Sequence, residues 1–443
     1  MKPIIKALLA LLVGTAALWL WASWDALVAA QGLFGWRTQM IQFTGVLAMA
    51  AMSAGMLLAL RPSWLEPRLH GLDKMYRLHQ WLGIAALALA IAHWLWKHAP
   101  KWAQQAGWVQ RPPRGPRPEP GSELLRFLQD QRHLAEQIGE WAFYAMLVLV
   151  AIALWRRFPY RHFYISHRWL ALAYLPLVWH SVILLEPGAW ATPLGALMAA
   201  LLVVGSVAAL ASLSRRIGMR RKAVGVIEEL DYIDGVRVNA VTVHLRERWA
   251  GHAPGQFAFV SFADEESHHP FTIASAWQAD GRLRFLIKEL GDYTGSLRQR
   301  LRKGMLAVVE GPYGRFQFDG PSQRQIWVAG GIGVTPFIAR LEQLAREPDG
   351  RTIDFFYSTA GLQEERLQQI AAAAAAAGIR LHVTVSGRDP RLDGAAVRAA
   401  VPEWVQADVW FCGPTAFGQA LREDLCAHGL PESCFHQELF EMR

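Results

Sequence analysis

Six long apolar segments dominate the first half of this sequence, and they limit its possible folds more than any other feature. They lie at about residues 4–24, 40–60, 80–97, 138–155, 166–185 and 191–213. Each is close to the length that an α-helix needs to cross about 30 Å of hydrocarbon. Only 19% of the 443 residues are charged, which is low for a soluble protein of this size. The sequence therefore predicts a membrane-embedded bundle of six helices that contact lipid.

Basic residues between these segments predict how the bundle is oriented. Four clusters alternate onto one side: Lys2 and Lys6; Arg61, Arg68, Lys74 and Arg77; Arg156, Arg157 and Arg161; Arg215, Arg216, Arg220, Arg221 and Lys222. The positive-inside rule makes that side, with both chain termini, cytoplasmic. The Pro-rich stretch at 98–137 also holds basic residues but falls outside, where long loops follow the rule less strictly. Nucleic-acid binding is disfavoured because the basic residues do not line one soluble face.

The N-terminal segment bears on whether the first helix is retained, and the cysteines bear on metal clusters and disulfides. MKPIIK followed by an apolar run resembles a cleaved signal peptide, but the run of nearly twenty residues is long for a signal core and favours a retained helix. Cys412, Cys426 and Cys434 have no cluster spacing, which argues against iron–sulfur ligation and a disulfide scaffold.

The sequence changes character after residue 216. Apolar runs shorten to strand length, separated by Gly and Pro turns and polar helical segments: VTVHL, FAFVSF, LRFLIKEL, IWVAG, IDFFYS, LHVTVSG and VWFCG. In the later part strands and helices alternate, which predicts a parallel α/β sheet.

Four histidines bracket two of the predicted helices. His79 and His93, fourteen residues apart, bracket the third apolar run, and His167 and His180, thirteen apart, bracket the fifth. Each pair spans about 20 Å of ideal helix. Two such helices offer an imidazole pair at each of two depths, and haem iron commonly takes axial imidazole. Histidines at helix ends near the membrane surface are the alternative, but ionisable residues inside membranes are rare and usually functional.

The spacing on the fifth run needs a further explanation. Fourteen residues return to nearly the same helical face, about 40° off, whereas thirteen miss it by about 140°. Pro176 lies between His167 and His180. We expect this proline to kink or rewind the helix so that both rings face one side.

This histidine pattern resembles the ferric reductase and NADPH oxidase superfamily, especially its bacterial NOX-like members. The second half is similar to the ferredoxin–NADP reductase module that those proteins append. The resemblance implies a six-helix haem domain at 1–216, an antiparallel β-barrel FAD domain at 217–320 and an α/β NAD(P)H domain at 321–443. It also implies an oxidoreductase in a bacterial-type plasma membrane.

The resemblance also assigns the four histidines. His79 and His167 would hold an inner haem b, and His93 and His180 an outer one. This assignment agrees with the orientation expected from the basic connections.

Two motifs are similar to the flavin-binding segments of this superfamily. In HPFTIAS, the residues implied to contact the flavin are His269, Pro270, Phe271, Thr272 and Ser275. Many flavoreductases have Arg where His stands, and His binds phosphate more weakly at neutral pH. An edge strand ending in a turn is the alternative.

The second flavin motif is GDYTGSL, which follows LIKEL. Gly291 and Thr294 are placed where a helix N-terminus can bind the FAD pyrophosphate, with Lys288 as a weaker candidate.

IWVAGGIGVTPF has the form of a dinucleotide-binding turn between a strand and a helix. Gly330, Gly331 and Gly333 would let the backbone approach a pyrophosphate, and Thr335 and Pro336 would begin the helix.

VWFCGPTAF forms another predicted strand-to-helix turn. The resemblance places Cys412 beside the nicotinamide, followed by Gly413 and Pro414. A small buried thiol is the alternative. The resemblance also places an aromatic residue, here Phe440, over the flavin ring, where the nicotinamide must displace it. Tyr357 and Arg388 are candidates for the adenosine end, and NADPH is favoured over NADH.

The expected path runs from NAD(P)H through FAD and two haems to an acceptor on the far side. The resemblance favours dioxygen, giving superoxide, over a ferric chelate; a haem subunit that donates electrons to a protein partner is a further alternative, although no partner is required. Lys97, one turn beyond His93, and Arg37 place cations near the outer haem. The oxidase branch would have His at the Lys97 position, and this departure weakens the oxygen interpretation.

Overall fold

The computed structural model describes residues 2–110, 122–155, 157–263, 268–361 and 364–438. Two compact units divide the chain, one within residues 1–217 and the other within 218–441. Each unit has its own core, so each is described by itself.

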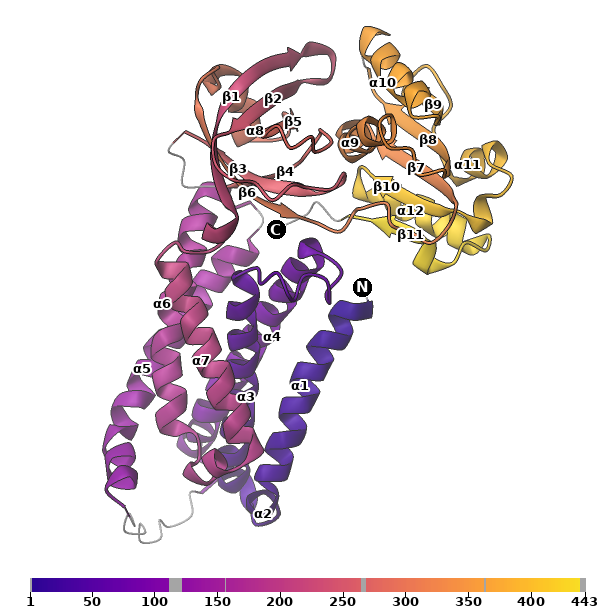
Figure 1. The fold of residues 1–443 in the computed structure, drawn as a ribbon. Helices are drawn as coiled ribbons and strands as arrows, with labels where there is room; N and C mark the ends of the chain where they lie inside the picture. The colour runs from indigo at the N-terminus through magenta and orange to yellow at the C-terminus, as the bar shows by residue number, and fades with distance from the viewer. Residues whose placement is uncertain (1, 111–121, 156, 264–267, 362–363, 439–443) are drawn as a thin grey trace. The chain divides into compact units, whose positions relative to one another are not determined.

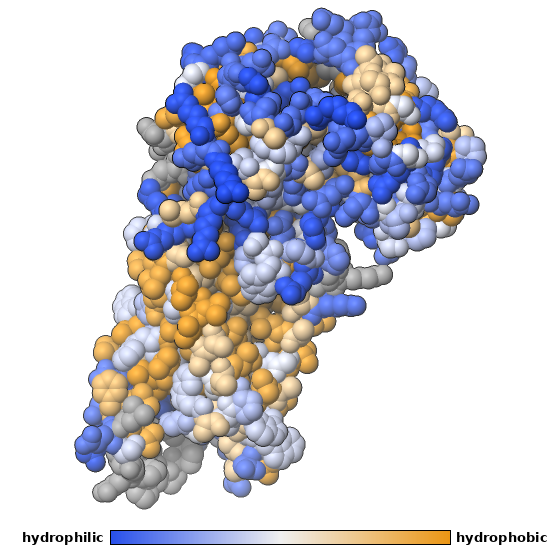
Figure 2. Space-filling model, viewed as in Figure 1, coloured by the Kyte–Doolittle hydropathy of each residue, from blue (hydrophilic) through white to orange (hydrophobic). Residues whose placement is uncertain are grey.

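The first unit is a helical bundle in which every predicted apolar segment forms a helix (Figure 1). Its long helices are α1 (Lys2–Ala22), α3 (Gly32–Ala59), α4 (Leu72–Gln105), α5 (Glu123–Leu154), α6 (Tyr160–Leu184) and α7 (Pro193–Leu213), with the short α2 (Trp24–Val28) after the first. The view in Figure 2 shows mainly apolar residues over the middle of these helices.

Five described helices are long and apolar enough to cross a membrane: Ile4–Ala22, Gly32–Ala59, Leu72–Gln105, Leu125–Leu154 and Pro193–Leu213. Helix α6 has 25 residues but is less apolar, since it carries His167, Arg168 and His180. It packs against α5 and α7 in the same bundle. The helix predicted as the fifth span is therefore present, and its lower hydropathy comes from the residues that make it a candidate site.

The second unit begins with an antiparallel sheet whose strand order is β4-β3-β6-β1-β2-β5. Its strands are β1 (Lys222–Ile233), β2 (Val238–Leu245), β3 (Phe257–Phe262), β4 (His269–Thr272), β5 (Arg282–Lys288) and β6 (Leu306–Tyr313). A bridge between Ile273 and Phe285 joins the chain just after β4 to β5, so the two edges of the sheet meet and close a barrel. Alternate residues of β2 and β5 point into the barrel core, as a strand period of two requires.

A parallel sheet of order β11-β10-β7-β8-β9 follows. Its strands are β7 (Arg324–Gly330), β8 (Thr352–Thr359), β9 (Arg380–Val385), β10 (Asp408–Cys412) and β11 (Phe435–Gln437). Between them lie α9 (Thr335–Leu344), α10 (Glu364–Ala376), α11 (Gly394–Ala400) and α12 (Thr415–Ala427), while α8 (Asp292–Arg300) belongs to the barrel region. Strands β7 and β10 are buried along almost their whole length, as expected for a sheet covered on both faces. The predicted fold class is confirmed.

Candidate functional site

The four predicted histidines form two facing pairs. The ring centroids of His79 and His167 lie 5.8 Å apart, and those of His93 and His180 lie 6.1 Å apart. An iron bound to a nitrogen of each ring at about 2 Å would separate two ring centres by roughly 6 Å. The spacing therefore fits one bis-histidine iron per pair. The first pair, nearer the C-terminal end of α7, is called the inner pair, and the second is the outer pair.

Backbone carbonyls fix the orientation of three of these rings. Nδ1 lies 2.8 Å from Gly55 O in His79, 2.9 Å from Ile41 O in His93 and 2.8 Å from Ala135 O in His180. A carbonyl can only accept, so each Nδ1 must carry the proton, which leaves the Nε2 lone pair free to bind a metal.

The fourth ring lacks such a carbonyl contact. His167 Nδ1 has no hydrogen-bond partner among the described residues, and the ring stacks on Phe163 with centroids 5.0 Å apart. No described group of three or more His, Cys, Asp or Glu side chains can hold a metal ion.

Glycines face three of the four rings. A Cβ on Gly139 would overlap the ring of His180, and one on Gly45 would lie 3.2 Å from the ring of His93. A Cβ on Gly55 would make ordinary contact with His79, at 3.9 Å. The missing side chains let α3 and α5 approach the rings closely enough to offer their carbonyls.

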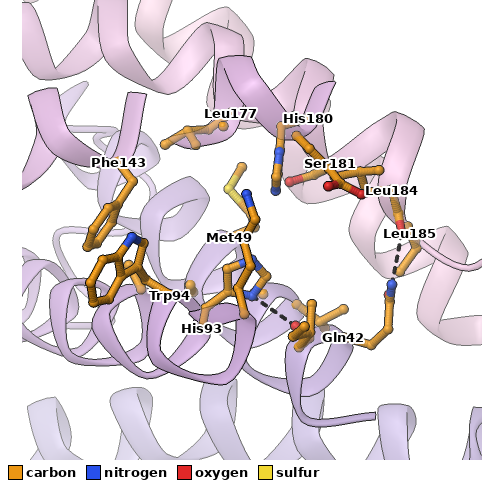
Figure 3. Close-up of a pocket in the computed structure, with 18 of the residues that line it drawn as sticks. Gln42, Met49, His93, Trp94, Phe143, Leu177, His180, Ser181, Leu184 and Leu185 are labelled. Atoms are coloured by element: carbon orange, nitrogen blue, oxygen red, sulfur yellow. Dashed lines mark hydrogen bonds between the residues drawn. The ribbon is translucent and has the colours of Figure 1, made fainter. Parts of the chain in front are cut away.

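A cavity surrounds the outer pair, and Figure 3 shows His93 and His180 pointing toward one another across it. Apolar side chains line much of the wall, including Met49, Trp94, Phe143 and Leu177. Gln42 crosses the cavity's edge and donates to Leu184 O at 2.8 Å. An apolar wall with few polar groups suits a flat hydrophobic macrocycle.

Charged residues cluster in the same cavity. The cations are Arg37, Lys97, Lys101 and Arg132, and the carboxylates are Glu136 and Glu140. Lys97 Nζ lies 2.9 Å from Glu140 Oε2, so the cation expected beside the outer haem forms an ion pair.

The HPFT stretch forms β4, which pairs with β3 from Val260 opposite His269 to Phe257 opposite Thr272. Thus Pro270 and Phe271 lie within a paired strand. The His269 ring stacks on Tyr293, with centroids 3.6 Å apart and planes 15° apart. Burial and then the neighbouring His268 lower the pKa of His269 to about 4. Its ring is therefore neutral at neutral pH and offers no positive charge to a phosphate.

Ser275, just beyond β4, makes backbone contacts. Its Oγ accepts a bond from Arg284 N at 3.1 Å, and its carbonyl oxygen lies 2.8 Å from His252 Nε2.

The second flavin motif begins α8. Gly291 is the N-cap residue, and Thr294 Oγ1 accepts bonds from Leu290 N at 2.9 Å and Gly291 N at 3.2 Å. The threonine hydroxyl thus satisfies the start of its own helix. Lys288 Nζ lies 3.9 Å from where a Cβ on Gly331 would be, which places the ammonium beside the dinucleotide turn.

The two strand-to-helix turns pack against each other because β7 and β10 are neighbouring parallel strands. A Cβ on Gly333 would overlap the carbonyl of Cys412, and one on Gly330 would lie 2.8 Å from Pro414 Cδ. Gly331 has φ +57, Gly413 lies against Gly330, and Thr335 and Pro336 begin α9 as predicted.

Cys412 itself is 1% exposed. Burial and then the charge of Glu438 raise the pKa of its thiol well above the usual range. The thiol is therefore protonated at neutral pH.

The two candidates for the adenosine end differ in exposure. Tyr357 is 3% exposed within the core of the nucleotide domain, where its ring stacks with Phe355. Arg388 lies at the surface and pairs with Asp389, with Nε 3.2 Å from Oδ1. Phe440 lies outside the described residues.

Two family matches cover much of the chain. Residues 44–178 match the ferric reductase like transmembrane component family, and residues 230–317 match a FAD-binding domain family. The chain has the domain architecture of the ferric reductase and NADPH oxidase superfamily. That architecture joins a ferric-reductase-like transmembrane component to a FAD-binding domain, and five described helices of this chain are long and apolar enough to cross a membrane.

Individual relatives resemble only part of it. A flavohemoprotein of Bordetella pertussis is 29% identical over 210 residues, covering 42% of this chain and 52% of the relative. The reductase component of a Rhodococcus jostii propane 2-monooxygenase is 24% identical over 203 residues, covering 42% and 55%. The chain thus spans about half the length of these relatives. A flavohemoglobin structure from Malassezia yamatoensis aligns with 91% of this chain and 98% of its own, at 16% identity and a TM-score of 0.48.

Three residues of the candidate site have no signal in the sequence analysis. Glu140 and Tyr293 lie inside motifs or helices that were recognised, but no spacing rule singles them out. Glu438 is 7% exposed, and its Oε1 lies 2.9 Å from where a Cβ on Gly314 would be. Glu438 lies two positions before the predicted Phe440, but no motif or spacing singles it out.

Proposed function

We propose that the chain transfers electrons from NADPH or NADH, through FAD and two haems b, to an acceptor on the opposite side of the membrane. The observation that carries this proposal is the pair of facing imidazole sets at two levels of one bundle. When bound, FAD accepts a hydride and the haem irons pass single electrons, which is chemistry that the side chains alone do not supply.

The four histidines would hold the two haem irons. His79 and His167 would hold the inner haem, and His93 and His180 the outer one. The support is geometric: ring separations near 6 Å, and Nε2 left free in the three rings whose Nδ1 faces a carbonyl. The levels differ by about 20 Å along the helices.

The reductase module would bind the two nucleotides. The Gly330, Gly331 and Gly333 turn suits a dinucleotide pyrophosphate, and the nearby Lys288 ammonium adds a positive charge. Cys412 would lie beside the nicotinamide as a neutral thiol. The remaining proposed contacts to FAD are Pro270, Phe271, Thr272, Ser275, Gly291 and Thr294.

Specificity for NADPH would need a cation at the 2′-phosphate. Arg388 is the candidate, and its exposed position leaves it accessible. Since Asp389 already pairs with it, a 2′-phosphate would have to compete for the guanidinium. Burial of Tyr357 favours a structural role for that ring.

Dioxygen, giving superoxide, is the acceptor that we propose first, on the family resemblance. A ferric chelate is the second candidate because four cations and only two carboxylates line the outer cavity, and this charge favours anions. Both proposals place the acceptor side opposite a cytoplasmic reductase module in a bacterial-type plasma membrane, as the basic connections predict.

The test uses the purified full chain in proteoliposomes. NADPH and FAD are added outside, so that only molecules with an exposed reductase module react. If oxygen is the acceptor, cytochrome c trapped inside is reduced, and superoxide dismutase inside abolishes that signal. Anaerobic reduction of trapped Fe(III)–EDTA would instead support the chelate. Haem reduction with neither product would point to a protein partner, and no haem reduction by NADPH would contradict the proposed function.

A further inference from the structure

An ion pair lies in the wall of the outer cavity. Lys97 of α4 and Glu140 of α5 approach to 2.9 Å, with side chains 20% and 30% exposed. Both line the cavity that contains His93 and His180. The pair is thus shielded from bulk water more than a typical surface salt bridge.

Several hydrogen bonds hold these two charges in one geometry. Tyr144 Oη donates to Glu140 Oε1 at 3.0 Å, and Trp94 Nε1 donates to Tyr144 Oη at 3.3 Å. Arg37 donates to the Lys97 carbonyl at 3.1 Å. A carboxylate that accepts from both an ammonium and a phenol is satisfied on both oxygens. The arrangement fixes where each charge lies.

Both charges line the cavity that contains the outer histidines. Lys97 follows His93 by one helical turn, about 6 Å along α4. The ion pair holds the Glu140 carboxylate 2.9 Å from the Lys97 ammonium. The two opposite charges therefore lie together in the wall of the space that an outer haem would fill.

We propose that the charges of the Lys97–Glu140 ion pair set the reduction potential of the outer haem. This inference rests on the proposed function, because it requires a haem between the outer histidines. Reduction adds one electron to the iron, so a nearby cation stabilises the reduced form and a nearby carboxylate destabilises it. In the wild type Glu140 offsets Lys97, which keeps the potential low enough for transfer to a weak oxidant.

Other charges lie near the same cavity. Lys101 lies another turn out along α4, and Arg132 pairs with Glu136 at 3.4 Å. His98 Nε2 lies 3.7 Å from Glu140 Oε1. Asp130 is the matched control, because it carries the same charge on the same helix but is exposed and does not line the cavity.

The experiment is a potentiometric titration of the purified full chain, followed by the haem absorption bands. We expect Glu140→Gln to raise the outer-haem midpoint potential and Lys97→Gln to lower it, with the double variant near wild type. The inner haem, about 20 Å away, should keep its potential in every variant. Asp130→Asn should leave the outer potential near its wild-type value. Glu140→Asp and Lys97→Arg keep the charge and should restore most of the wild-type value.

The outcomes separate this inference from the proposed function. If both variants keep two haems and their outer potentials do not move, or move in the same direction, the pair only ties α4 to α5 and the inference is wrong. Loss of haem from Glu140→Gln that Glu140→Asp does not reverse would also overturn it. If the wild type itself binds no haem, it is the proposed function that fails.

Discussion

At the scale of single residues, glycines face the rings of three of the four paired histidines. Gly139 and Gly45 leave space for the rings of His180 and His93, whose Nδ1 atoms then reach backbone carbonyls. The histidines themselves were predictable from their spacing. The facing glycines were not, because their role depends on which helices become neighbours.

Gly139→Ala tests this close approach. The added methyl group would overlap His180, so we expect the ring to move, lose its bond to Ala135 and release the outer haem. Haem content measured by pyridine haemochrome should fall by about half, with the inner haem kept. Gly83→Ala, in α4 with nothing within 4 Å of the new Cβ, should keep full haem content. Equal haem content in both variants would show that the ring does not depend on this gap.

The pH dependence of the flavin domain follows from His269. Its folded pKa of about 4 lies below the ordinary histidine pKa of 6.5, so between these values the unfolded chain binds more protons than the folded one. The stability that a neutral His269 supports is complete above about pH 6.5 and is lost as the pH falls towards 4. The upper bound is about 3 kcal/mol.

His269→Phe should preserve the stack on Tyr293 while removing that proton uptake. The midpoint temperature of FAD release, measured from pH 7.5 to 4.5, should then fall less steeply with acid than in wild type. His428→Phe is the matched control, because His428 is the exposed C-cap residue of α12. This variant should retain the wild-type slope. Parallel slopes for wild type and His269→Phe would contradict the assignment.

At the scale of elements, the sequence predicted the helices and strands that have a regular apolar pattern. It missed the segments that are held by polar contacts. Helix α5 was expected from residue 138 but begins at Glu123, because its first turns are polar. Ser122 accepts a bond from Leu125 N at 3.3 Å, and Arg132 and Glu136 pair one turn apart. Strand β1 was likewise unpredicted, since acidic residues interrupt its apolar pattern.

Helix α6 illustrates a prediction whose outcome depended on packing. Ideal geometry separates His167 and His180 by about 140°, yet each ring meets its partner on α4. The helix runs without interruption through Pro176. The pairing was expected from the sequence, but only packing against α4 decides where each ring lies.

The contact between the two strand-to-helix turns gives a prediction at this scale. Gly333→Ala would force the dinucleotide turn away from the Cys412 carbonyl, so we expect the rate of flavin reduction by NADPH to fall at least tenfold, mainly through weaker nucleotide binding. Stopped-flow absorbance of the flavin measures this rate directly. Gly83→Ala, in α4 of the helical unit and with an open Cβ position, should stay within about twofold of wild type. A Gly333→Ala enzyme as fast as that control would mean that the turn does not hold the nucleotide.

At the scale of the whole molecule, the order of the domains could be predicted from the sequence, but the electron acceptor could not. The long apolar segments predicted the helical unit, and the alternation of strand-length runs with helices predicted the parallel sheet. The barrel between them was implied only by the family resemblance. The outer cavity is different. Its charged lining comes from three helices. Glu136 and Glu140 can therefore be recognised as cavity residues only once α3, α4 and α5 are assembled.

The central claim is that one bundle holds two haems, each between two imidazoles, and haem stoichiometry tests it most directly. The purified full chain should contain two haems b per polypeptide. His93→Ala and His180→Ala should each retain one haem with the same spectrum, while His98→Ala, on α4 outside the pairs, should retain two. A colourless wild-type protein without iron, or a His93→Ala variant with both haems intact, would contradict the account.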